Sequence, residues 1–149
     1  MQSPWTCRLV ACTRPRQLEE LGTDVRIDKS LPRERGRQLE EIAREFLENQ
    51  GLVTVSRNYN CKLGEIDLIM QHGDTLVFVE VRGRRSQRFG SPAETVTPAK
   101  QNRLIRTAQV FLSAHPRFLD WPCRFDVLAL DTADPAPRPQ WIQNAFDAS

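Results

Sequence analysis

The sequence predicts an α/β fold in which a mixed β-sheet is flanked by helices. Apolar residues recur at helical spacing in two segments, and short runs of β-forming residues lie between and after them. The resulting order is helix, three strands, helix, strand. The 149 residues suffice for one domain with one sizeable core, which we expect at residues 32–149, after a poorly ordered leader at residues 1–31.

The two helices are predicted at Arg35–Gln50 and Pro98–Ser113. Gly51 follows the first segment as a C-terminal stop signal. In the first helix the residues expected to face inward are Leu39, Ile42, Ala43, Phe46 and Leu47. In the second they are Leu104, Ile105, Ala108, Phe111 and Leu112.

Strands are predicted where β-forming residues cluster between turn signals. The segments are Leu52–Tyr59, Gly64–Met70, Thr75–Val81 and Arg124–Leu130, and Trp141–Phe146 is a candidate edge strand. Residues 75–81 are apolar almost throughout, which is typical of a central strand covered on both faces. In the strand before it, alternation predicts that Ile66, Leu68 and Met70 share one face.

Bulk composition excludes several classes of protein. The chain is 40% apolar and 27% charged, as in ordinary soluble domains, and its net charge of +2 is too small to indicate a partner. No apolar run approaches the roughly 18 residues of a membrane span. The four cysteines form no CxxC pair, so a zinc site is not expected and a reduced, cytoplasmic protein fits best.

Acidic residues converge on two neighbouring strands. With Gly73-Asp74 at the tip of a hairpin turn, Asp67 lies directly opposite Glu80. With His72-Gly73 at the tip instead, Glu65 faces Glu80 and Asp67 becomes its diagonal neighbour on the same face. Only a three-residue loop would separate these groups.

Carboxylates placed in this way repel each other, and a charge in a buried strand is costly unless it is compensated. Mg²⁺ or Mn²⁺ held by one or two carboxylates is one solution. Arg82, on the same face as Glu80, is another. Two interpretations remain open: a metal site, or an ordinary Glu80–Arg82 ion pair with Asp67 facing solvent.

A basic segment follows the acidic cluster. Its members are expected to bind the phosphates of a nucleic acid: Arg84, Arg85, Arg88, Lys100 and Arg103. The alternative is an ordinary solvated loop.

These residues resemble a known pattern. Asp67 matches the first acid, and Glu80-Val81-Arg82 matches the E-x-K, of PD-(D/E)xK restriction-endonuclease-like nucleases. Over about residues 35–146 the chain is similar to the YraN family of uncharacterised bacterial proteins. The blocks that carry this similarity are GEIDLIM (64–70), VFVEVRGR (77–84) and RFDVLAL (124–130), with LEEIA (39–43) in the first helix.

The resemblance implies a restriction-endonuclease-like core, α-β-β-β-α-β, with a mixed sheet of four to five strands, similar to Holliday-junction resolvases. It also implies that Glu40 joins Asp67 and Glu80 as a metal ligand and that Gln101 lies near the site as a nucleic-acid-binding residue. Those resolvases work as dimers, so a homodimer is considered, although no dimer interface can be recognised in the sequence.

One departure from the pattern concerns its lysine. Arg82 stands at that position, and arginine stays charged where lysine can lose a proton. The predicted catalytic residues are Asp67, Glu80 and Arg82. The predicted function is therefore a Mg²⁺- or Mn²⁺-dependent nuclease acting on DNA, with branched or damaged DNA as the implied substrate. The alternative is a nucleic-acid-binding or accessory protein that retains the fold without the chemistry.

Overall fold

The computed structural model describes residues 32–84, 96–133 and 137–148. The leader predicted at residues 1–31 lies outside them, as do Arg85 and Arg88, so those predictions stay predictions. No helix of the described residues is long and apolar enough to cross a membrane.

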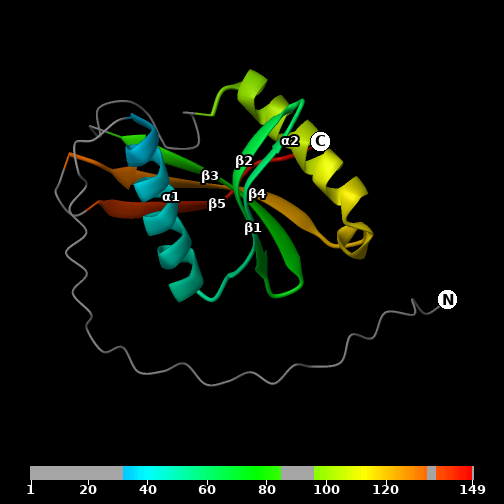
Figure 1. Ribbon diagram of the computed structural model, residues 1–149. Coiled ribbons are helices and arrows are strands. Elements are labelled where there is room, and N and C mark those ends of the chain that lie inside the picture. The colour runs from blue at the N-terminus through cyan, green and yellow to red at the C-terminus, as the bar shows by residue number, and fades with distance from the viewer. Residues whose placement is uncertain (1–31, 85–95, 134–136, 149) are drawn as a thin grey trace.

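A five-stranded mixed sheet lies between two helices (Figure 1). The elements in chain order are α1 (Pro32–Asn49), β1 (Val53–Cys61), β2 (Gly64–His72), β3 (Thr75–Arg84), α2 (Pro98–Ala114), the 3₁₀ helix η2 (Pro116–Phe118), β4 (Cys123–Asp131) and β5 (Arg138–Phe146). The strands lie side by side in sequence order, and only β3 and β4 pair in parallel. The predicted α/β class is thus confirmed, and the fifth strand completes the order α-β-β-β-α-β-β.

The last strand is longer than the candidate edge strand at residues 141–146. β5 begins at Arg138 and includes Pro139, whose partner across the ladder is Leu130. β5 is the outermost strand, and an edge position tolerates a proline because one side of the strand needs no ladder hydrogen bonds. The strand therefore begins three residues before the predicted edge strand and includes a proline.

Each face of the sheet is covered by one helix, and each face has its own apolar core. On the α1 face the buried residues are Leu39, Ala43, Leu47, Leu52, Leu68, Met70, Val77, Val79, Leu128 and Leu130. On the α2 face they are Ile66, Ile69, Leu76, Phe78, Val96, Leu104, Ala108, Phe111, Phe118, Phe125 and Val127. Residues of β3 alternate between the two cores, as expected for a central strand.

The turn between β2 and β3 decides the register of the acidic residues. His72 pairs with Thr75, so Gly73-Asp74 forms the tip, which confirms the first of the two predicted turns. Gly73 adopts a positive φ of 60°, a conformation that glycine reaches without strain.

One prediction about β2 is wrong. Leu68 and Met70 pack in the core under α1, but Ile66 packs in the core under α2. The alternation breaks at Asp67, between Leu68 and Ile66. Opposite this point β1 has Asn58 at a positive φ of 48°, a conformation that asparagine tolerates better than most residues. The two faces of the β1–β2 hairpin therefore exchange at Asp67. The end of the hairpin, around Gly64, lies next to α2.

Buried polar groups also hold β4 to β5. The Asp126 carboxylate accepts hydrogen bonds from Trp141 Nε1 at 2.9 Å, from Asn144 N at 2.9 Å and from Arg124 Nε at 3.0 Å. The register between the strands shifts at this position, between the pairs Phe125↔Phe146 and Val127↔Ile142. Asp126 is therefore a structural acid whose carboxylate accepts hydrogen bonds from donors in the irregular part of the ladder.

Candidate functional site

The β2–β3 ladder ends inside the sheet, and the candidate site lies where it ends. Its last pair is Leu68↔Val79. Beyond it, residues 64–66 of β2 pair with β1, whereas residues 80–84 of β3 pair with β4. The two strands separate here, as Figure 1 shows, and we call the gap between them the fork. The register of the β2–β3 ladder, continued by one residue past this pair, sets Asp67 opposite Glu80 where the fork begins.

Asp67 bridges the fork. Its Oδ2 accepts a hydrogen bond of 2.8 Å from the backbone N–H of Val81 on β3. The side chain of Asp67 therefore points toward β3. It is half-buried there. This contradicts a solvent-facing Asp67, whereas the Glu80–Arg82 ion pair of the same interpretation is present.

Glu80 is the most deeply buried acid at the fork, with an exposed fraction of 4%. One of its oxygens, Oε1, lies 3.2 Å from Arg82 Nε and 3.2 Å from Lys100 Nζ. Arg82 and Glu80 form an ion pair without a hydrogen bond, because Arg82 Nε has no hydrogen-bond partner of suitable geometry among the described residues. The other oxygen, Oε2, is buried and has no hydrogen-bond partner among the described residues either.

The start of α2 places Lys100 at the fork. Thr97 caps this helix, its Oγ1 accepting a hydrogen bond from the Lys100 backbone N–H at 3.3 Å, and Pro98 fixes the first turn. Lys100 was predicted only as a phosphate-binding residue. That role stays a prediction, but the structure shows that the Lys100 ammonium group reaches the buried carboxylate of Glu80.

The surroundings of Asp67 change its acidity. The pKa of Asp67 is raised from 3.8 to about 7, chiefly by burial and further by the negative charges of Glu80 and Glu40. The hydrogen bond from Val81 and the charge of Lys100 act in the opposite direction but do not compensate. A carboxyl group with a pKa near 7 exchanges its proton readily at neutral pH, which suits acid–base chemistry or binding of a cation that displaces the proton.

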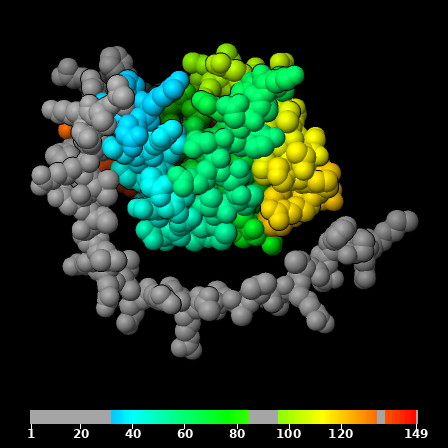
Figure 2. Space-filling view, viewed as in Figure 1, coloured from blue at the N-terminus to red at the C-terminus, as the bar shows by residue number. Residues whose placement is uncertain are grey.

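Residues from both helices influence Asp67, although the helices lie on opposite faces of the sheet. Glu40 belongs to α1 and Lys100 to α2, and the charges of both affect the pKa of Asp67. Asp67 lies where the β2–β3 ladder ends, and the charges of both helices act on it there. In Figure 2 the surface is hollowed between α1, the β1–β2 hairpin and the start of α2.

The predicted ligand set is only partly brought together. Among the described residues no three acidic, histidine or cysteine side chains are close enough to form a metal-binding group. Asp67 and Glu80 meet at the fork, whereas Glu40 contributes its charge from α1. The pair still fits a hard divalent cation, because Glu80 Oε2 is buried without a partner and Mg²⁺ typically takes one or two carboxylates plus water and phosphate oxygens.

The other predicted residues take different positions. Gln101 does not join the acids: its Nε2 donates to the carbonyl oxygen of Val96 at 3.0 Å. Arg84 lies at the end of β3, where its carbonyl oxygen accepts hydrogen bonds from Thr132. Arg103 is exposed on α2 and lines a pocket beside Lys100.

Comparison with known proteins identifies the family. Residues 39–130, from α1 to β4, match the model described as Uncharacterised protein family UPF0102. The UPF0102 protein PA4424 of Pseudomonas aeruginosa is 49% identical over 123 residues, covering 81% of this chain and 98% of that protein. The UPF0102 protein NE0719 of Nitrosomonas europaea is 49% identical over 115 residues, covering 77% and 95%. The chain belongs to the family UPF0102.

Proposed function

We propose that this protein is a metal-dependent nuclease that hydrolyses phosphodiester bonds of DNA at the fork. One observation carries the proposal: two carboxylates meet where the sheet divides, and the buried Oε2 of Glu80 has no partner among the described residues. A buried carboxylate oxygen without a hydrogen bond is costly, and a divalent cation would satisfy it.

Asp67 and Glu80 would hold the cation. A bound divalent cation supplies an activated water molecule and neutralises charge on the phosphate. The raised pKa of Asp67 is consistent with this role, because two acids crowded at one place favour either a shared proton or a cation.

Arg82 and Lys100 divide the role of the motif lysine between them. Arg82 stays charged and offers its guanidinium group to the phosphate. Lys100, whose Nζ lies 3.2 Å from Glu80 Oε1, brings a second positive charge to the same carboxylate.

The similarity of the sequence to the YraN family and to PD-(D/E)xK nucleases supports the same proposal and adds the substrate class. Holliday-junction resolvases, which the pattern also resembles, act on branched DNA. Branched or damaged DNA is therefore the first substrate to test.

One observation favours a second candidate function. Lys100 and Arg82 both lie within 3.2 Å of the same oxygen of Glu80, so two cations already compensate its charge. A site neutralised in this way could bind nucleic acid without hydrolysing it.

A cleavage assay separates the two candidates. Linear, flap and four-way DNA substrates are incubated with the protein in Mg²⁺ or Mn²⁺, beside Glu80→Gln and the control Glu45→Gln, which changes an exposed acid of α1. We expect cleavage by the wild type and the control and none by Glu80→Gln. Cleavage that persists in Glu80→Gln excludes the fork as the active site, and salt-sensitive binding without cleavage supports the second candidate.

A further inference from the structure

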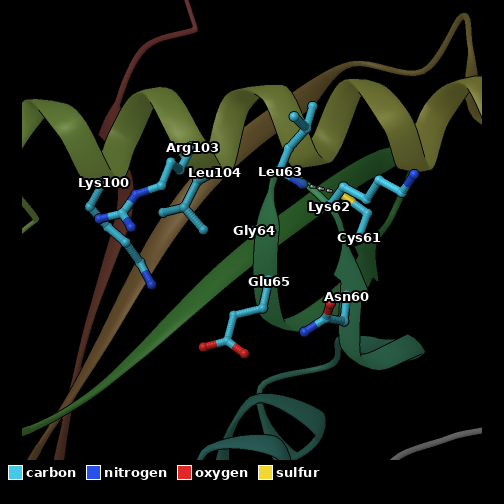
Figure 3. A pocket seen from close by; sticks show the side chains of 9 residues that line it. All are labelled: Asn60, Cys61, Lys62, Leu63, Gly64, Glu65, Lys100, Arg103 and Leu104. Carbon is cyan, nitrogen blue, oxygen red and sulfur yellow. Dashed lines mark hydrogen bonds between the residues drawn. The ribbon is translucent and has the colours of Figure 1, made fainter.

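A pocket lies beside the fork, between the end of the β1–β2 hairpin and the beginning of α2 (Figure 3). Residues 60–65 of the hairpin form one wall, and Lys100, Arg103 and Leu104 form the other. Its volume is about 310 Å³. Pockets for small ligands begin at about 300 Å³, so the space suits a single nucleotide and is too small for a base pair.

The pocket and the fork share a side chain. Lys100 lines the pocket and also places its ammonium group 3.2 Å from Glu80. The hairpin lies close to α2 because Gly64 has no side chain: a Cβ there would approach Thr107 Oγ1 to 3.0 Å. A group bound in the pocket therefore lies one side chain away from the proposed reaction centre.

The two walls of the pocket differ in chemistry. On the α2 side, Lys100 and Arg103 are cationic, and Arg103 forms no ion pair within the described part of the chain. On the hairpin side lie the carboxylate of Glu65 and the amide of Asn60, both of them exposed, and the cationic Lys62, whose side chain extends away from Glu65 (Figure 3). A bare phosphate would be repelled by Glu65. A nucleotide can instead place its phosphate against α2 and the N–H groups of its base against Glu65 and Asn60.

We propose that this pocket binds one unpaired nucleotide of the DNA strand that crosses the fork. The base must be unpaired because its hydrogen-bonding edge is occupied in a duplex. The inference rests on the proposed function, since it assumes that a nucleic acid strand reaches the fork. It adds the specificity of that site, namely preference for DNA with a single-stranded segment.

Binding is measured without catalysis, by fluorescence anisotropy in EDTA, using a blunt duplex and the same duplex with a single-stranded tail. We expect the wild type to prefer the tailed duplex. Arg103→Gln should reduce binding of the tailed duplex roughly ten- to hundredfold, the usual effect of losing a charged hydrogen bond. Its salt slope should fall by about 0.7, the value for one phosphate contact on a single strand.

Two further variants make the test specific. Arg106→Gln removes an exposed arginine of α2 that does not line the pocket, and it should keep the preference for the tail. Glu65→Gln should weaken binding of the tailed duplex if a base contacts this carboxylate. It should tighten binding if the pocket attracts only phosphate, because a negative charge has been removed. The melting temperature of each variant confirms that it is folded.

The inference is overturned by equal binding of the two duplexes, by equal losses in Arg103→Gln and Arg106→Gln, or by unchanged or tighter binding in Glu65→Gln. These results can be told apart from failure of the proposed function. If the preference for the tail depends on Arg103 and Glu65 but no cleavage occurs, the proposed nucleotide pocket is supported and the proposed hydrolysis is refuted. If cleavage requires Glu80 while both pocket variants bind the tailed duplex as the wild type does, the proposed nucleotide pocket is refuted and the proposed hydrolysis is supported.

Discussion

Replacing Asp67 by asparagine should stabilise the protein, and the gain should depend on pH. The folded protein holds the Asp67 carboxyl with a pKa of about 7, against an ordinary value of 3.8. Between these values the folded state binds a proton that the unfolded state has released, so stability falls as pH rises from about 4 to about 7. Asparagine carries no charge and can still accept the hydrogen bond from Val81.

The size of the effect follows from the shift. A rise of about 3 pKa units at about 1.4 kcal/mol per unit gives an upper bound of about 4 kcal/mol. Because Asp67 is only half-buried, we expect the free energy of unfolding at pH 8 to rise by about 2–4 kcal/mol. This corresponds to roughly 8–15 °C in melting temperature for a domain of this size.

The assay is urea denaturation of the wild type and Asp67→Asn at several values of pH between 4 and 8, without divalent ions. The stability difference should grow from pH 4 to pH 7 and then level off. Asp74→Asn, at the exposed tip of the β2–β3 turn, is the matched control and should show no such trend. A difference that is absent at pH 8, or equally large at pH 4, would refute the proposed burial of this acid.

Three other substitutions test contacts around the site and in the sheet. Lys100→Met leaves the buried carboxylate of Glu80 with one cation instead of two. It should lower the free energy of unfolding by about 1–3 kcal/mol in urea denaturation at pH 8. An unchanged free energy of unfolding would show that the ion pair does not form in solution. Asp126→Ala should cost about 3–5 kcal/mol and shift the fluorescence of Trp141, whose indole N–H loses its acceptor; an unshifted spectrum would contradict that hydrogen bond. Gly64→Ala should cost about 1–3 kcal/mol in the same assay, because its φ is +155° and a Cβ would meet α2; an unchanged stability would contradict this close approach.

The elements that follow from local patterns could be predicted from the sequence. Both helices, the central position of β3 and the turn at Gly73-Asp74 follow from apolar periodicity and turn chemistry. That turn also predicts the register that sets Asp67 against Glu80. These features depend on residues close together in the chain, which is why periodicity could reveal them.

The features that depend on tertiary packing could not be predicted in this way. Alternation along β2 predicted that Ile66 shares a face with Leu68, but the hairpin turns over where it leaves β3. Lys100 lies 20 residues from Glu80 in the sequence, and only the packing of α2 on the sheet brings its amine to that carboxylate. The start of α2 at Pro98 was predicted correctly, but the sequence did not show which of its side chains reaches the fork.

The central claim is that Asp67 and Glu80 form a site for a divalent cation, and binding of Mn²⁺ tests it without any assumption about the substrate. Titration of Mn²⁺ followed by electron paramagnetic resonance is done on the wild type, Glu80→Gln, Asp67→Asn and the control Glu45→Gln at pH 8, above the pKa of Asp67. We expect saturable binding in the wild type and the control, and loss of that binding in both fork variants. Absence of binding in the wild type, or equal binding in all four proteins, would contradict the claim.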